Sequence, residues 1–475
     1  MIIAYLIASI TIALLLFVSR NRALSIALMT LFVLLQCGLT AYEFTIKDLA
    51  DAVYFKPDAL ALIMLAVLTV VCIPAFIHKC NYVNPEDDSP RVRGIYQGAM
   101  VLLVTALSAA YLSAHIAVTW IFVEITTLSA SALVFHRRNA GSIEATWKYI
   151  FVCSISLVFV FIGILLLGIS LGNAQQFDLQ YDTLVKLAPT LDTFWIKIAF
   201  VFIFAGYTAK FGLVPMYTAG IDAKDKAPAP AAGLFSSVLM IVGFVGVFRM
   251  WQIVAHTSVM PWAANVVAVA ALLSILIAAV YLLKVKNVKR MLAYSSVEHM
   301  GVVALGLAAG GVGYFAAILH IVLHTFAKSA LFFQVGHIYH IYHTKNIYHI
   351  GNYLKFNRAG AVLLLLGFVC ITAMPPSGLF ISELMVFKSI FEAHSYVALI
   401  AVLVMLTIII WALGKNFFKM LFTPAPSCGN IGVIKVSPIE TVSQFVLLAL
   451  VFWLGMCPPQ FFVDLINDAV QLLTY

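Results

Sequence analysis

The chain has 475 residues, of which 63% are hydrophobic and only 10% are charged. A soluble domain carries about 25% charged residues, so this composition excludes an ordinary soluble enzyme and indicates that most of the chain lies in lipid. A formal net charge of +8 would suggest a nucleic-acid partner in a soluble protein. Here the basic residues follow the predicted loops, which indicates membrane topology instead.

Hydrophobic segments of about 20 residues, the length that crosses a bilayer, recur along the whole chain. The first has no basic residues before it and no small-residue cleavage site, so we interpret it as a membrane span rather than a signal peptide. The fold class predicted from this pattern is an all-α polytopic membrane protein. Its 14 predicted spans are 2–18, 23–42, 58–78, 95–112, 115–135, 149–171, 194–214, 229–250, 262–283, 292–309, 313–336, 361–391, 397–421 and 439–457.

The predicted loops alternate in charge. Loops after even-numbered spans hold only Lys47, Lys56 and Lys186. Loops after odd-numbered spans hold 20 of the 28 basic residues. By the positive-inside rule these basic loops face the cytoplasm, which puts both termini on the outer side. The 20 residues are Arg20, Arg22, Lys79, Arg91, Arg93, Arg137, Arg138, Lys148, Lys224, Lys226, Lys284, Lys286, Lys289, Arg290, Lys345, Lys355, Arg358, Lys415, Lys419 and Lys435.

Five basic residues lie within the spans. Lys197, Arg249 and Lys388 are near span ends, where a long side chain can reach the interface, and we interpret them as snorkelling residues. Lys210 and Lys328 lie deeper. A charged side chain at the centre of a bilayer costs at least about 2.5–3.5 kcal/mol on insertion scales, so these two lysines indicate a functional site.

Two spans are interrupted by proline, which removes a backbone donor and crowds the preceding turn. Span seven breaks at Pro215, five residues after Lys210, and span twelve breaks at Pro375–Pro376. Paired broken helices at matching positions are typical of transporters built from inverted repeats, and an offset of five spans reverses the orientation between copies. The pattern therefore predicts a doubled architecture with ion sites beside the breaks.

Glu124 lies in the middle of span five, in the stretch WIFVEITTLSA. Burial alone disfavours a charged carboxylate, and a nearby cation reverses that effect. We therefore predict a pair between Glu124 and Lys210. A change in the distance between the two groups would change both pKa values, and a proton would be taken up and released as they approach and separate. The alternative is a static buried ion pair, which stabilises little.

The stretch LHIVLHTFAKSALFF places His320, His324 and Lys328 at i, i+4 and i+8 of span eleven. They share one helix face and extend over about 12 Å of its axis. Histidine changes its charge near neutral pH, so we interpret the row as a string of proton-transfer groups. Two alternatives are a metal site, although no HExxH motif occurs, and simple hydrogen bonds to neighbouring side chains.

Several further polar residues are candidates. Glu383, after the second break, is predicted to be the terminal acid of the same relay. Glu298 and His299, near the predicted start of span ten, suit either a proton entry point or an interfacial structural role. Glu144 and Lys148 have the i, i+4 spacing of a surface pair.

The seven cysteines (Cys37, Cys72, Cys80, Cys153, Cys370, Cys428 and Cys457) include no Cys-x-x-Cys pair. This spacing disfavours an iron–sulfur cluster, a zinc ribbon or a disulfide framework. The histidines His337, His340, His343 and His349 suit no single helix face, and we do not predict that they bind metal. The sequence thus gives no cofactor or metal motif in this chain.

The run from Lys210 to Pro230, the stretch KRMLAYSS and the HxxxHxxxK pattern of span eleven resemble the proton-translocating, antiporter-like subunits of respiratory complex I, membrane-bound hydrogenases and Mrp cation/proton antiporters. The stretches IEATWKY, AYSSVEHMG and AKSALFF look most like component F of hydrogenase-4, which belongs to complexes of the formate-hydrogenlyase type. The resemblance covers roughly spans four to thirteen.

This resemblance implies a 14-helix fold with two inverted five-helix repeats. The repeats would occupy 91–255 and 256–425, preceded by helices 1–3 in 1–90 and followed by helix 14 in 426–475. It also implies roles for the residues already singled out. The family's proton-translocation residues map to Glu124, Lys210, Lys328 with His320 and His324, and Glu383.

The chain departs from the family in three places. The charged residue of span eight is missing from GLFSSVLMIVGF, where Ser236 and Ser237 are the polar candidates for bridging the two halves, together with water. The family's HxWLPDAH is here YTAGIDAK, with Asp222 kept. Some complex I subunits of this family carry a long lateral helix. We expect none here, because span fourteen leaves too little room for it.

The resemblance implies a proton-conducting subunit in a prokaryotic cytoplasmic membrane, with a group 4 nickel–iron hydrogenase as the expected partner. The nickel–iron and iron–sulfur centres are expected in partner subunits, because this chain has no redox site of its own. The alternatives are a subunit of a Mrp-type sodium/proton antiporter, the ion module of an inorganic-carbon uptake system, and a membrane enzyme that holds a metal or a lipid head group.

Overall fold

The computed structural model describes residues 1–81, 89–171, 178–424 and 437–474. Cys428 and Lys435 lie outside these ranges. The described chain is almost entirely helical. Its helices are α1 (Ile2–Val18), α2 (Arg22–Thr45), α3 (Ala59–Asn81), α4 (Pro90–Leu112), α5 (Ile116–Val134), α6 (Ala140–Ser170), α7 (Tyr181–Leu187), α8 (Thr193–Phe211), α9 (Thr218–Lys226), α10 (Ala229–Ser236), α11 (Val238–Ala255), α12 (Met260–Leu282), α13 (Val288–Ala309), α14 (Val312–Tyr342), α15 (Tyr353–Phe356), α16 (Arg358–Ile371), α17 (Gly378–Glu392), α18 (Tyr396–Phe422), α19 (Pro438–Met456) and α20 (Gln460–Gln471).

The protein is a multi-pass membrane protein. In the described chain, 12 helices are long and apolar enough to cross a membrane, with α10 and α11 counted together, and α1 and α16 are shorter apolar helices. With α16 and α17 taken as two halves of one span, these helices correspond one to one to the 14 predicted segments. Hydropathy succeeds here because a backbone in lipid must satisfy its own hydrogen bonds, so each apolar segment of this length becomes a helix.

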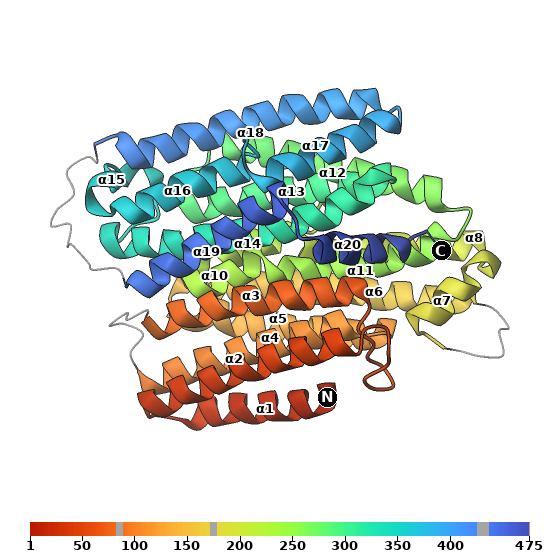
Figure 1. Ribbon diagram of the computed structural model, residues 1–475, viewed down its shortest axis with the longest axis horizontal. Coiled ribbons are helices and arrows are strands. Elements are labelled where there is room, and N and C mark those ends of the chain that lie inside the picture. Colours follow the sequence, from red (N-terminus) through yellow and green to blue (C-terminus); the bar gives the residue numbers. More distant parts are fainter. Residues whose placement is uncertain (82–88, 172–177, 425–436, 475) are drawn as a thin grey trace.

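The helices run side by side, from α1 at one edge of the bundle to α18 at the opposite edge (Figure 1). The central helix is α14, which packs against α3, α10, α13, α16, α17 and α19. The span formed by α10 and α11 is also completely enclosed by protein. Polar side chains on these central helices therefore face other helices and not lipid.

Both predicted breaks occur where the prolines stand. Helix α8 ends at Phe211, and Gly212 follows with a φ of +86°, a conformation that glycine adopts readily. The chain then passes the cis peptide bond Val214–Pro215 into the short helix α9. The second break contains the cis bond Pro375–Pro376. Helix α17 restarts after it, with the Ser377 side chain accepting a hydrogen bond at its N-terminus.

The charge alternation corresponds to two ends of the bundle. At one end, loops that follow odd-numbered spans contact one another: Arg93 donates to the carbonyl of Arg20, and Asn352 donates to that of Thr423. At the other end, the loop between α2 and α3 holds both termini. Its Asp51 binds the N-terminal amine, and its Lys47 pairs with Asp468 of α20. Both termini thus share one end of the bundle, as predicted.

One of the three interpretations of snorkelling residues is wrong. Arg249 is only 4% exposed, and its guanidinium pairs with Asp58 and bonds Gln252 at 3.1 Å. It is buried because α11 is enclosed by protein, which the hydropathy of α11 alone does not reveal. Lys388 is exposed and lies 3.7 Å from Glu392, and Lys197 lies over the ring of Trp262.

A twelve-residue helix, α20, follows the last span, where the sequence analysis expects no further helix. It is amphipathic, and its buried face includes Phe462, Leu465 and Ile466. This face packs on α3 and α14. The three predicted domain boundaries stay a prediction, and the one at 425/426 lies outside the described residues.

Helix α19 contacts the start of α17 through two glycines. A Cβ added at Gly455 would lie 2.0 Å from the Cα of Gly378, so no larger residue fits without moving a helix. This contact fixes α19 against the half-helix that begins after the second break.

We expect Gly455→Ala to destabilise the protein, because overpacking of a tight contact costs about 1–3 kcal/mol. The measurement is the thermal unfolding midpoint in detergent. Gly38→Ala is the matched control, since nothing lies within 4 Å of its added Cβ. Equal midpoints for the two variants would contradict the proposed role of this contact.

Candidate functional site

The predicted ion pair between Glu124 and Lys210 is not formed. Lys210 is 4% exposed, and its ammonium donates to the hydroxyl of Tyr149 at 3.0 Å. The Glu124 carboxylate accepts a hydrogen bond from Ser154 at 3.3 Å. Among the described residues no ion pair within 4 Å joins the two groups, although they remain within electrostatic range. Two side chains of α6 separate them, which spacing along α5 and α8 cannot predict.

Lys224 is predicted to be a loop lysine, but the structure buries it. It belongs to α9, the connecting helix that follows the first break, and is 3% exposed. Its ammonium lies 3.1 Å from the sulfur of Met240. Burial lowers the pKa of Lys224 to about 7. The amine therefore exchanges its proton in the neutral range, as a proton carrier must.

A small cavity connects Lys210 with Lys224. Its volume is about 20 Å³, and both lysines and Tyr149 are among its lining residues. A cavity of this size has room for about one water molecule. On its other side Lys224 lies within electrostatic range of His324 and Lys328 of α14. Lys224 thus stands between the first break and the central helix. The sequence gives one indication that Lys224 is special. It is the last residue of YTAGIDAK, at the position where the family motif HxWLPDAH has a histidine.

The three predicted residues of span eleven are all completely buried on the continuous helix α14. The Lys328 ammonium donates to the Ser295 hydroxyl at 2.7 Å and to the carbonyl of Leu292 at 3.1 Å. Both ring nitrogens of His324 lack a hydrogen-bond partner among the described residues. The predicted shared face is therefore confirmed, and its polar neighbours come from α13 and α17.

His299 and His320 form a hydrogen-bonded chain that crosses from α13 to α17. His299 Nδ1 lies 3.0 Å from His320 Nε2, and His320 Nδ1 lies 2.9 Å from the Ser382 hydroxyl. When Ser382 donates its single proton to the carbonyl of Leu379, it accepts from His320. With both rings neutral, the protons then point from His299 through His320 to Ser382.

Two glutamates flank this histidine chain. Glu383 Oε1 lies 3.9 Å from His299 Nδ1, and Glu298 Oε2 lies 3.6 Å from His299 Nε2. Glu298 and His299 are 1% and 0% exposed in the middle of α13. The prediction that they lie near the membrane interface is wrong, because α13 begins four residues earlier than expected. His299, His320 and Glu383 are also close enough to share a metal ion.

Ser236, the candidate bridge in span eight, contacts Ser296 of α13 at 2.8 Å. Ser296 donates to the carbonyl of Leu292, which also accepts from Lys328. A carbonyl oxygen has no proton to pass on. The serines therefore join the two halves by contact, and Lys224 is a titratable group that lies between them. Ser237, between α10 and α11, donates to the carbonyl of Gly233 in α10.

Ion pairs fix α9 at the end of the bundle that carries the basic loops. Glu144 and Lys148 form the predicted surface pair at 2.5 Å. Asp222 pairs with Arg290 and lies 4.0 Å from Lys148. Asp225, only 2% exposed, pairs with Lys345 at 3.3 Å. These contacts hold α9, and so Lys224, against α6, α13 and the loop after α14.

The histidines after span eleven divide into two kinds. His343 and His349 are exposed. His337 is buried inside α14, because this helix extends six residues beyond its predicted end, and it meets His78 of α3 and Glu440 of α19. No sequence pattern joins residues so far apart in the chain.

The comparisons with known proteins agree with this architecture. The profile of a family described as NADH:quinone oxidoreductase/Mrp antiporter, TM, matches residues 113–409. A hydrogenase-4 component F homolog from Methylacidiphilum infernorum (isolate V4) is 28% identical over 376 residues, which is 77% of this chain and 78% of that protein.

Two solved structures show the fold. A chain of the membrane-bound sulfane sulfur reductase, an archaeal respiratory membrane complex, superposes with a TM-score of 0.85 at 20% identity, over 99% of this chain and 96% of that one. A chain of the Mrp complex from Dietzia sp. DQ12-45-1b superposes with a TM-score of 0.83 at 16% identity, over 98% and 96%.

We expect Asp225→Asn to lower the stability of the protein. Burial raises the pKa of Asp225, but Lys345 and Lys226 outweigh that effect and lower it to about 2 from 3.8. The charged group therefore contributes about 2 kcal/mol at neutral pH. Because the folded pKa is depressed, this contribution is present above about pH 4 and is lost as the pH falls toward 2.

The measurement is the difference in thermal unfolding midpoint between wild type and Asp225→Asn in detergent, from pH 7 down to pH 3. The difference should narrow below about pH 4. Asp464→Asn, at an exposed position, is the control. A difference that stays constant across this range would show that the charge of Asp225 contributes nothing.

Proposed function

Because the chain belongs to the NADH:quinone oxidoreductase/Mrp antiporter transmembrane family, we propose that it is the proton-conducting membrane subunit of a redox-driven complex. The observation that carries the proposal is the row of buried titratable side chains through the central helices. It begins at Glu124 of α5 and Lys210 of α8, passes His320 of α14, and ends at Glu383 of α17, after the second break. Such groups are costly in a membrane bundle and mark ion pathways.

The proposed proton path has two parts joined by Lys224. In the first part, Glu124 and Lys210 exchange a proton by way of Ser154 and Tyr149, whose hydroxyls contact them. Lys224 then receives the proton across the small cavity. A rearrangement that brings Lys210 toward Glu124 would move the positive charge of Lys210 away from Lys224. The Lys224 amine would then bind a proton more readily, because less like charge opposes it.

In the second part, the proton passes from Lys224 to His324 and Lys328, and on to the histidine chain. Through the hydrogen bond between His320 and His299 the proton can move onto the His299 ring, whose Nδ1 lies 3.9 Å from Glu383 Oε1, once the rings turn to exchange their donor and acceptor nitrogens. Glu383, beside His299, is the proposed terminal acid, and Glu298 a neighbouring proton acceptor.

The proposed partner is a peripheral redox arm of the group 4 nickel–iron hydrogenase class, together with other membrane subunits. The 28% identity to a hydrogenase-4 component F homolog supports this choice. Redox chemistry in that arm would move charges near Lys210 and so drive the cycle. We also propose that the basic end of the bundle faces the cytoplasm and that both termini lie on the outer side of a prokaryotic cytoplasmic membrane.

A cation/proton antiporter subunit is the second candidate, and the likeness to a chain of a Mrp complex keeps it in view. Purification from native membranes in mild detergent, followed by mass spectrometry and metal analysis, separates the two. Nickel, iron and hydrogenase-like subunits support the first proposal. Recovery with antiporter subunits alone, without nickel or iron, would replace it with the second.

We expect Lys210→Ala to reduce proton translocation by a factor of roughly 10², the lower range for loss of a positioned proton-transfer group. The measurement is redox-driven acidification of inverted membrane vesicles containing the assembled complex, with the redox rate recorded in parallel. Lys388→Ala, which removes an exposed lysine, is the control. Unchanged pumping in the Lys210 variant would contradict the proposed function.

The role of Lys224 predicts a different pattern of variants. Burial lowers the pKa of Lys224 to about 7, so the amine mostly holds a proton below pH 7 and can mostly accept one above it. Lys224→Arg, whose side chain stays charged, and Lys224→Met should both reduce proton translocation by a factor of roughly 10². Lys224→His should retain most of it, since histidine titrates near pH 6.5.

The measurement is the same vesicle assay from pH 6 to pH 8, with complex assembly checked by size-exclusion chromatography. A Lys224→Arg variant that pumps as well as wild type would exclude Lys224 as a carrier. The other steps of the path would remain to be judged by the Lys210 variant.

A further inference from the structure

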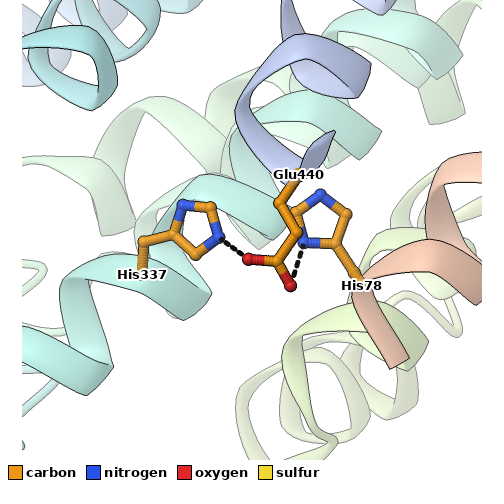
Figure 2. Close-up of side chains that lie close together, drawn as sticks. All are labelled: His78, His337 and Glu440. Carbon is orange, nitrogen blue, oxygen red and sulfur yellow. Dashed lines mark hydrogen bonds and ion pairs between the residues drawn. The ribbon is translucent and has the colours of Figure 1, made fainter. Parts of the chain in front are cut away.

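A second cluster of titratable side chains lies apart from the proposed proton path. It consists of His78 near the C-terminal end of α3, His337 near that of α14, and Glu440 in the first turn of α19. Figure 2 shows both imidazole rings turned toward the carboxylate between them. On α14, His337 lies nine residues beyond Lys328, about 13 Å along the axis. The path therefore makes no use of this cluster.

The distances within the cluster suit a tetrahedral metal ion. His337 Nε2 lies 3.1 Å from Glu440 Oε2, and His78 Nδ1 lies 3.8 Å from Glu440 Oε1. All three ligand atoms lie within 4.8 Å of one another. Zinc bound to histidine nitrogen and carboxylate oxygen at about 2.0–2.2 Å places adjacent ligand atoms roughly 3.3 Å apart. Small movements of the side chains would complete this geometry.

The hydrogen bond on the far side of His337 favours a cation between it and Glu440. Gln334 donates through its amide nitrogen to the hydroxyl of Tyr353, so its oxygen faces His337 Nδ1 at 3.2 Å. Nδ1 must then carry the proton, and Nε2 presents a lone pair to the carboxylate. Two acceptor atoms 3.1 Å apart need a cation between them, which is either a proton, held by the ring or by the carboxyl group, or a metal ion.

A glutamine also lies beside the outer ring nitrogen of His78. His78 Nε2 lies 3.2 Å from the amide nitrogen of Gln444 and 3.4 Å from the Ser443 hydroxyl. The amide oxygen of Gln444 has no partner among the described residues. Turned toward the ring, it would accept the Nε2 proton and leave Nδ1 free to bind a metal. Metal-binding histidines usually have such a partner on their other nitrogen.

Packing fixes these rings in place. His78 stacks on Phe333 with ring centroids 4.6 Å apart. His78, His337 and Glu440 are 4%, 6% and 8% exposed, so each lies at the protein interior but is not sealed. A ligand set of two histidines and one glutamate is one that zinc uses, with a fourth position left for water.

We propose that His78, His337 and Glu440 form a binding site for Zn²⁺ or a similar divalent transition metal. The ion would tie α3, α14 and α19 together at the end of the bundle that carries the basic loops. It stabilises the folded chain by binding only to it. This site does not depend on the proposed function, and its failure would leave the proton path untouched.

The test is zinc binding to the intact complex, purified through a tag without histidine and treated with a chelator. Titration against a competing fluorescent chelator measures affinity, and elemental analysis measures zinc per complex. The variants His78→Ala and Glu440→Gln should each bind one zinc ion fewer per complex than wild type. Added zinc should raise the thermal unfolding midpoint of wild type but not that of either variant. Gln334→Leu should weaken binding by roughly 10- to 100-fold, as expected when the partner of a ligand is removed.

Two control variants make the result specific. His343→Ala removes an exposed histidine near the same end of the bundle and should leave binding unchanged. His320→Ala removes a member of the other group that is close enough to hold a metal, and it should also bind as wild type. Loss of zinc in His320→Ala but not in Glu440→Gln would overturn the proposal. Equal zinc binding by wild type and by both His78→Ala and Glu440→Gln would mean that the cluster is an ion pair only.

Discussion

The structure depends on how three ammonium groups are kept inside an apolar bundle. Lys210, Lys224 and Lys328 each point at neutral partners: a tyrosine hydroxyl, a methionine sulfur, and a serine hydroxyl with a backbone carbonyl. Among the described residues, none of the three has a carboxylate within 4 Å. A direct ion pair would fix the charge on both groups. Neutral partners leave each lysine able to lose its proton, which proton transfer requires.

The broken helices supply the space for this arrangement. After Pro215 the chain forms the short helix α9 instead of continuing α8, and this places Lys224 beside Met240 and the small cavity. After Pro375–Pro376, α17 starts again with Ser382 and Glu383 facing the histidines of α13 and α14. An unbroken helix would place these side chains on a regular spiral. The interruptions let side chains of several helices converge.

The sequence predicted the spans well but predicted the contacts between them poorly. Hydropathy and loop charge place all 14 segments, because a backbone in lipid leaves few alternatives to helix. Lys210 and Lys328 were found because they are costly there. The missing Glu124–Lys210 contact, the buried Arg249 and the burial of Lys224 all depend on which helices are neighbours. His78 and Glu440 carried no signal, since 362 residue positions separate them and only the packing of α3 against α19 brings them together.

The two ends of the bundle differ from its centre in how they use charge. At the ends, direct ion pairs such as Arg249–Asp58, Arg290–Asp222 and Lys345–Asp225 hold loops and short helices in place. These pairs keep their charge, and so they are suited to anchoring. In the centre, serine, tyrosine and histidine side chains separate the ionisable groups. A structure that anchors its ends with fixed charges can leave its central groups free to titrate without losing the geometry that connects them.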